Sequence, residues 1–154
     1  TLAAVGAAIG VTRRAPGGDL ARVAAPAAAL TLVAALAVPF LADRWAASAR
    51  AVAASDPATA WARVGTAAAL DPWEPTIAES RGRIAEAAGD LDAALRSYQR
   101  AASLSRHPWL DEYRAARVLR RANRPAAARA ACARAVAGNP AEPALRAGPC
   151  SPPV

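Results

Sequence analysis

The sequence predicts an all-α fold in which one transmembrane helix precedes an α-solenoid of about three helical hairpins. Two observations support this prediction. Residues 23–42 are almost entirely apolar, with Thr31 as the only polar side chain. Farther along the chain, three stretches align with one another at a spacing of about 34 residues. Repeats of this kind bury a core by stacking, and they offer a surface for binding rather than for catalysis.

The apolar run is interpreted as a membrane span. As a helix, residues 23–42 reach about 30 Å, the thickness of the hydrocarbon core of a bilayer. Arg22 and Arg44 flank the run, and Trp45 stands where interfacial aromatic residues occur. Residues 1–22 are interpreted as the end of a preceding membrane segment and a short basic loop. By the positive-inside rule this loop faces the cytoplasm, so one crossing by residues 23–42 places the hairpins on the extracytoplasmic face of the cell membrane. A buried helix in a soluble domain and a cleaved signal sequence are the alternatives.

The hairpin region, residues 43–140, is predicted from turn and capping residues. Asp56 before Pro57 is typical of a helix start, with Asp as the N-cap and Pro at the first helical position. Gly89 and Asn123 are expected in turns, because both tolerate left-handed backbone angles. The expected helices cover about 43–55, 57–70, 74–88, 91–105, 110–122 and 125–137. Residues 141–154 contain four prolines and are predicted to be disordered.

Small and bulky residues recur at fixed offsets after each turn. The recurring positions are Ala60, Ala94 and Ala128, then Val64, Tyr98 and Cys132, then Ala67, Ala101 and Ala135. Together with Gly82, Ala116 and Pro140, they make residues 41–140 resemble three tetratricopeptide repeats. The leading helix of the first repeat holds the pattern only at Ser48 and Ala51. Extra residues after Leu104 are expected to alter the stacking of repeats two and three.

A second resemblance concerns the layout of the chain. Membrane helices followed by a short Ala- and Arg-rich repeat tail resemble the C-terminal end of actinobacterial O-antigen ligase or polymerase family membrane proteins. That family transfers glycans from polyprenyl-diphosphate carriers, and its catalytic loops would lie before this chain. The chain contains no Met and is expected to be part of something longer. It is therefore interpreted as a membrane-tethered interaction module or, alternatively, as the non-catalytic tail of such an enzyme.

The sequence shows no catalytic, cofactor-binding or metal-binding constellation. His107 is the only His, and no neighbouring group would orient it as a base or ligand. There is no glycine-rich phosphate loop and no Lys to serve one. Cys132 and Cys150 lack metal-ligand spacing. A small buried thiol is expected at Cys132, and a disulfide between the two cysteines is the alternative.

A basic cluster is the one feature with functional promise, in a chain of formal net charge +7. The residues expected to face the groove are Tyr113, Arg114, Arg117, Arg120 and Arg121, with Arg83 from the second repeat. Guanidinium groups one helical turn apart can hold carboxylates or phosphates bidentately. The predicted partner is therefore a protein, an anionic peptide or a lipid headgroup. A solvated basic face is the simpler interpretation.

Three tryptophans stand near the predicted junctions between hairpins. Packing between hairpins is the expected use of Trp61, Trp73 and Trp109, and ligand stacking is the alternative. The chain has few other aromatic residues to stack on bases and no recognised reader motif, so nucleic acid is not expected as a partner.

Overall fold

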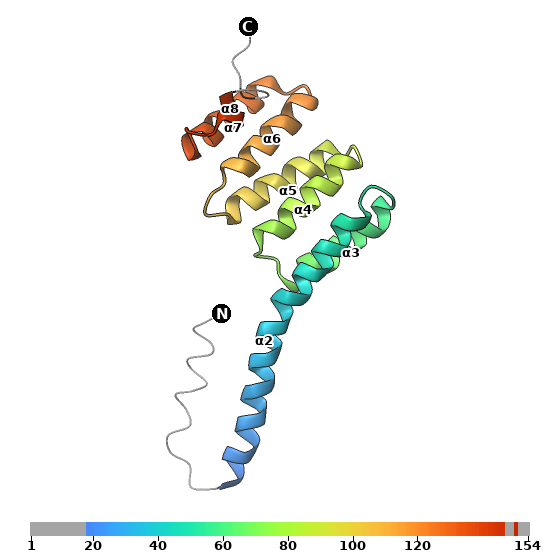
Figure 1. The fold of residues 1–154 in the computed structure, drawn as a ribbon, viewed down its shortest axis with the longest axis vertical. Helices are drawn as coiled ribbons and strands as arrows, with labels where there is room; N and C mark the ends of the chain where they lie inside the picture. The colour runs from blue at the N-terminus through green and yellow to red at the C-terminus, as the bar shows by residue number, and fades with distance from the viewer. Residues whose placement is uncertain (1–17, 147–149, 151–154) are drawn as a thin grey trace. The chain divides into compact units, whose positions relative to one another are not determined.

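The computed structural model describes the backbone of residues 18–146 and 150, and the side chains of residues 32, 33, 35, 37–143, 145 and 150. Within these ranges the structure is helical and contains no strand (Figure 1). The helices are α2 (Gly18–Val52), α3 (Pro57–Leu70), α4 (Pro75–Ala87), α5 (Leu91–Leu104), α6 (Trp109–Arg121), α7 (Pro125–Gly138) and α8 (Pro143–Arg146). The predicted all-α class is confirmed. The chain divides into two compact units, Thr1–Ala37 and Val38–Val154, and all helices from α3 onward belong to the second.

Helix α2 contains the whole of the predicted membrane span, residues 23–42. Over the part of the chain that the structure describes, none of the helices combines the length and the apolar character needed to cross a bilayer. The predicted transmembrane helix is thus not confirmed. Residues 1–17 of the predicted preceding segment, and the side chains of residues 18–31, lie outside the described residues.

The 34-residue period is kept from α3 to α7. Helix α5 begins and ends 34 residues after α3, α7 does so after α5, and α6 does so after α4. The loops before α4 and α6 each contain four residues. The extra residues expected after Leu104 are not found, because that loop is as long as the one before α4.

Two of the hairpin turns use the left-handed residue that the sequence predicts. Gly89 has a φ of 81° and Asn123 a φ of 55°. The amide of the next residue then donates to a carbonyl in the last turn of the helix, from Asp90 to Ala85 and from Arg124 to Leu119, each at 2.9 Å. These bonds satisfy carbonyls that a helix end leaves open.

The turn between α2 and α3 departs from this plan. It spans residues 53–56, one residue more than the turns at 88–90 and 122–124. The buried residues of α2 are Ala42, Ala46 and Ala49, whereas Ser48 is only partly buried and Ala51 is exposed. The predicted match at Ser48 and Ala51 is wrong, because the added turn residue moves the packed positions of α2 toward the N-terminus.

The core is a series of three clusters that neighbouring helices share. The first joins the end of α2 with α3 and α4, the second joins α4, α5 and α6, and the third joins α6 and α7. Helix α4 gives Ile84 to the first cluster and Ala85 to the second, while α6 gives Val118 to the second and Leu119 to the third. Consecutive helices from α3 to α8 pack on one another (Figure 1), a solenoid-like arrangement.

The recurring positions named from the sequence fill these clusters. None of the nine is more than 7% exposed: Ala60, Val64, Ala67, Ala94, Tyr98, Ala101, Ala128, Cys132 and Ala135. The predicted positions of the small and bulky residues are therefore confirmed. Small residues at two of the three positions let the helix backbones approach closely, so the third can carry the larger side chain.

Part of the tail predicted to be disordered packs on the last hairpin; residues 147–149 and 151–154 of that tail lie outside the described residues. Helix α8 contacts α7, and Leu145 is only 2% exposed. Cys150 forms a disulfide with Cys132, with 5.2 Å between their Cα atoms. The expected free thiol at Cys132 is therefore wrong.

Candidate binding surfaces

A hollow between α4 and α6 brings together half of the predicted groove residues. It has a volume of about 460 Å³ and is lined by Arg83, Glu86, Ala87, Arg117 and Arg121. We call it the α4–α6 groove. The Arg residues come from the second and third hairpins, and the stacking of those hairpins is what places them on one surface.

Glu86 organises the α4–α6 groove. Its carboxylate accepts hydrogen bonds from Arg117 Nη2 at 2.7 Å, Arg121 Nη1 at 2.9 Å and the Tyr98 hydroxyl at 3.0 Å. Partial burial alone would raise the pKa of Glu86, but the hydrogen bonds from Arg117 and Tyr98 lower it below its ordinary value of 4.5. Burial raises the pKa of Tyr98, so its hydroxyl stays protonated and can donate.

The remaining predicted groove residues have other surroundings. Arg114 is 11% exposed and donates to Glu79 at 3.0 Å and to Asp111 at 3.1 Å, which ties α6 to α4. Burial raises the pKa of Asp111, although Arg114 opposes this effect. Tyr113 is partly exposed and Arg120 is exposed, and neither lines the hollow. The structure therefore places Arg114, Tyr113 and Arg120 outside the α4–α6 groove.

The groove carries more positive than negative charge. Arg83, Arg117 and Arg121 are 55%, 47% and 50% exposed, and Glu86 is the one carboxylate among its lining residues. A guanidinium group has five N–H donors, so each Arg keeps donors beyond those that its ion pair uses. The bond to Glu86 also restricts the Arg117 and Arg121 side chains, which leaves less rotamer entropy to lose when a ligand binds.

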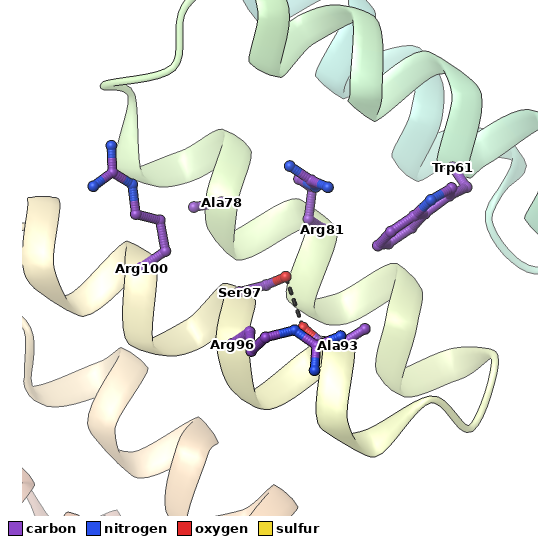
Figure 2. Close-up of a pocket in the computed structure, with 7 residues that line it drawn as sticks. All are labelled: Trp61, Ala78, Arg81, Ala93, Arg96, Ser97 and Arg100. Carbon is purple, nitrogen blue, oxygen red and sulfur yellow. Dashed lines mark hydrogen bonds between the residues drawn. The ribbon is translucent and has the colours of Figure 1, made fainter.

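A second hollow, of about 210 Å³, lies among α3, α4 and α5 (Figure 2). We call it the Trp61 hollow. It is lined by Trp61, Ala78, Arg81, Ala93, Arg96, Ser97 and Arg100. The Arg81 guanidinium carbon lies 5.2 Å from the centre of the Trp61 ring, within cation–π range. Arg81 Nε is buried and makes no hydrogen bond.

The tryptophans only partly behave as predicted. Trp61 is 40% and Trp73 is 69% exposed, and each ring holds an Arg side chain: Arg81 on Trp61, and Arg100 on Trp73 at 5.1 Å. Both rings thus contact the second hairpin, as expected of residues at this junction, but they remain exposed and are not part of the apolar core. Trp109 packs against α7 of its own hairpin rather than between hairpins, since a Cβ added at Gly138 would lie 3.0 Å from the Trp109 Cβ.

The sequence contains a partial signal for the Trp61 hollow. Arg96 and Arg100 are four residues apart, so they lie on the same face of α5. Their pairing with Arg81 and Trp61 depends on how α3, α4 and α5 pack, which spacing along one helix does not show.

Comparison with known proteins adds no relative to this picture. No family model matches the chain, and no curated protein matches its sequence. Among the residues that the structure describes, no group of three or more His, Cys, Asp or Glu side chains is arranged to hold a metal ion. The two hollows and their charges are therefore the features that indicate a function.

Proposed function

We propose that the chain is a helical-hairpin interaction module, and that the α4–α6 groove binds an acidic segment of a partner protein. The supporting observation is the pair Arg117 and Arg121, held by Glu86 and joined by Arg83 in one hollow. A carboxylate of the partner would accept hydrogen bonds from their free donors, and such charge-assisted bonds are each worth about 1.5–3 kcal/mol.

The tetratricopeptide interpretation supports the same proposal. The exact recurrence of the helices at 34 residues, the left-handed turns at Gly89 and Asn123 and the buried small residues fit that repeat. In such repeats the leading helix of each hairpin lines the binding surface. Helices α4 and α6 are the leading helices of the second and third hairpins, and they line the groove.

The test is the binding of a fluorescein-labelled, glutamate-rich peptide, followed by fluorescence anisotropy. Arg83→Glu reverses a half-exposed charge in the groove whose ion pair lies within its own helix. We expect it to weaken binding about tenfold or more, equivalent to about 1.4 kcal/mol. Arg129→Glu on α7 is the matched control, because Arg129 is exposed and the net charge changes equally.

The control separates a groove from general electrostatic attraction. Helical circular dichroism should be the same for both variants, and the control should bind as the wild type does. Equal weakening by Arg83→Glu and Arg129→Glu would show only a diffuse positive surface and would overturn the proposal. A wild-type protein that fails to bind the peptide would also overturn it.

Membrane attachment is a separate proposal that rests on the sequence. The apolar character of residues 23–42 supports attachment to the cell membrane, with the hairpins on the extracytoplasmic face. Recovery of the chain in the soluble fraction after carbonate extraction would rule this out. The alternative function, the tail of an O-antigen ligase-like enzyme, requires many further spans upstream in the gene, so reading that upstream sequence tests it.

A further inference from the structure

We propose that the Trp61 hollow is a binding site for a phosphate monoester dianion, separate from the α4–α6 groove and independent of its function. Three arginines line it, Arg81 on α4 and Arg96 and Arg100 on α5, with no carboxylate among the lining residues. The guanidinium group of Arg100 lies against Trp73, so Arg81 and Arg96 are the groups that would hold the anion. A dianion is the ligand that would best balance this charge.

The arginines of this hollow differ from those of the α4–α6 groove in their partners. Arg83, Arg117 and Arg121 each form an ion pair with a Glu on α4. Across the described chain, Arg81, Arg96 and Arg100 have no carboxylate within ion-pair distance. Their contacts are instead the rings of Trp61 and Trp73 and the Pro72 carbonyl, at 3.4 Å from Arg100 Nη2. No carboxylate of the described residues therefore neutralises their positive charge.

One donor in the hollow is also unsatisfied. Arg81 Nε is buried without a hydrogen-bond partner, and a buried charged donor normally has one. The Trp61 ring covers the guanidinium from one side, as Figure 2 shows, and Ser97 and Arg96 lie on the neighbouring helix. The side chain of Arg81 is only partly buried, and if it turned toward an oxyanion in the hollow, that anion would supply the missing acceptor.

The size and polar groups of the hollow favour a compact ligand. Its volume of about 210 Å³ is below the range of about 300–1,000 Å³ typical of sites for drug-sized molecules. The Ser97 hydroxyl now donates to the Ala93 carbonyl at 2.8 Å, and it can rotate to donate to an anion instead. A phosphate group fits within this volume, and the organic part of the ester would remain outside the hollow.

The two sites can be tested independently because α4 separates them. Arg81 and Arg83 are two residues apart, which corresponds to about 200° around a helix. Arg81 therefore faces the Trp61 hollow while Arg83 faces the α4–α6 groove. A variant in one site leaves the side chains of the other in place.

The experiment titrates the full chain, labelled with ¹⁵N, with inorganic phosphate and follows the Nε–H resonances of its arginines by NMR. We expect Arg81 to shift with saturation, and Arg96→Gln to weaken the apparent affinity about tenfold. Arg129→Gln on α7 is the matched control, with the same loss of one exposed charge, and it should leave the affinity unchanged.

A second arm distinguishes a soluble phosphate from a lipid headgroup. Co-sedimentation with phosphatidylcholine vesicles, with and without phosphatidic acid, is compared for the wild type and Arg96→Gln. Arg96-dependent binding to phosphatidic acid assigns the site to a lipid headgroup, and a response to inorganic phosphate alone assigns it to a small soluble ester. An unshifted Arg81 resonance, or equal weakening by Arg96→Gln and Arg129→Gln, would overturn the proposal.

Discussion

The second and third hairpins share one backbone plan but fill it differently. Tyr98 on α5 is fully buried, and its ring lies where a Cβ on residue 82 would be 2.6 Å from Cε1. Gly82 is therefore what admits this ring. In the third hairpin the equivalent pair is Cys132 and Ala116, so a smaller side chain faces a position that carries a Cβ.

The two hairpins also differ at their helix starts and in their neighbours. The Asp90 carboxylate caps α5 by accepting from the Ala93 amide at 2.9 Å, whereas Arg124 gives α7 no side-chain cap. The third hairpin is followed by α8 and the Cys132–Cys150 disulfide instead of another hairpin. A covalent bond thus occupies the position where the second hairpin packs an aromatic ring. The 34-residue period sets the positions of the helices, and the elements packed on each hairpin determine which side chain is buried between them.

Removing the aromatic ring from the second hairpin should have the largest effect on stability. We expect Tyr98→Ala to lower the free energy of unfolding by about 3–5 kcal/mol, because it leaves a cavity shared by α4, α5 and α6. Urea unfolding followed by circular dichroism at 222 nm measures the change.

Gly82→Ala tests whether the contact between residues 82 and 98 causes this effect. In the wild type it should destabilise by about 1–3 kcal/mol, since the new methyl group overlaps the ring. In the Tyr98→Ala background it should stabilise, because Ala favours the helix and fills part of the cavity. The same sign in both backgrounds would show that the ring contact is not what requires Gly82.

Breaking the disulfide should weaken the third hairpin slightly less than Tyr98→Ala weakens the second. Cys132 and Cys150 are 18 residues apart, and closing a loop of that length corresponds to about 3 kcal/mol in the chain-entropy model. Cys150→Ser should lower the free energy of unfolding by that amount. Reducing agent should do the same to the wild type and nothing to the variant; an effect of reductant on Cys150→Ser would contradict this account.

Acid should weaken the contact between the two hairpins at Glu86. Its pKa is below 4.5 in the folded state, so the ionised carboxylate stabilises the fold above about pH 4.5, and this contribution is lost as the pH falls through the folded-state pKa. Glu86→Gln should lower the free energy of unfolding by about 1–2 kcal/mol at pH 7. It should also make this free energy less dependent on pH between pH 5 and the folded-state pKa. If the free energy of unfolding of the variant falls in acid as steeply as that of the wild type, other groups cause the decrease.

Substituting the N-cap residues of α5 and α7 should have the smallest effects on stability, of opposite sign in the two hairpins. Asp90→Ala should destabilise by about 1 kcal/mol through loss of the α5 cap. Arg124→Asp should stabilise by about 0.5–1 kcal/mol if the new carboxylate caps α7, although it gives up the exposed contact with Asp92 at 3.6 Å. Thermal unfolding of both variants against the wild type measures the difference.

The helix boundaries and the repeating core were predictable because their causes are local. Asp56 and Asp90 cap helices, Gly89 and Asn123 take the left-handed turns, and apolar residues recur at helical spacing. The predicted groove was only partly correct in its geometry. Arg83, Arg117 and Arg121 line one hollow, whereas Arg114 is drawn into an ion pair with Glu79 that no local pattern indicates.

The sequence by itself determined the helices, their turns, the 34-residue period and the buried small residues. Each depends on backbone preferences and contacts within a few residues. Only the tertiary structure decided that Glu86 joins Arg117 and Arg121, that Cys132 is bonded to Cys150 and that Trp61 stays exposed beside arginines that no carboxylate of the described residues neutralises. Charge pairing and covalent bonding depend on distances across the chain, and those distances are set by how the hairpins stack.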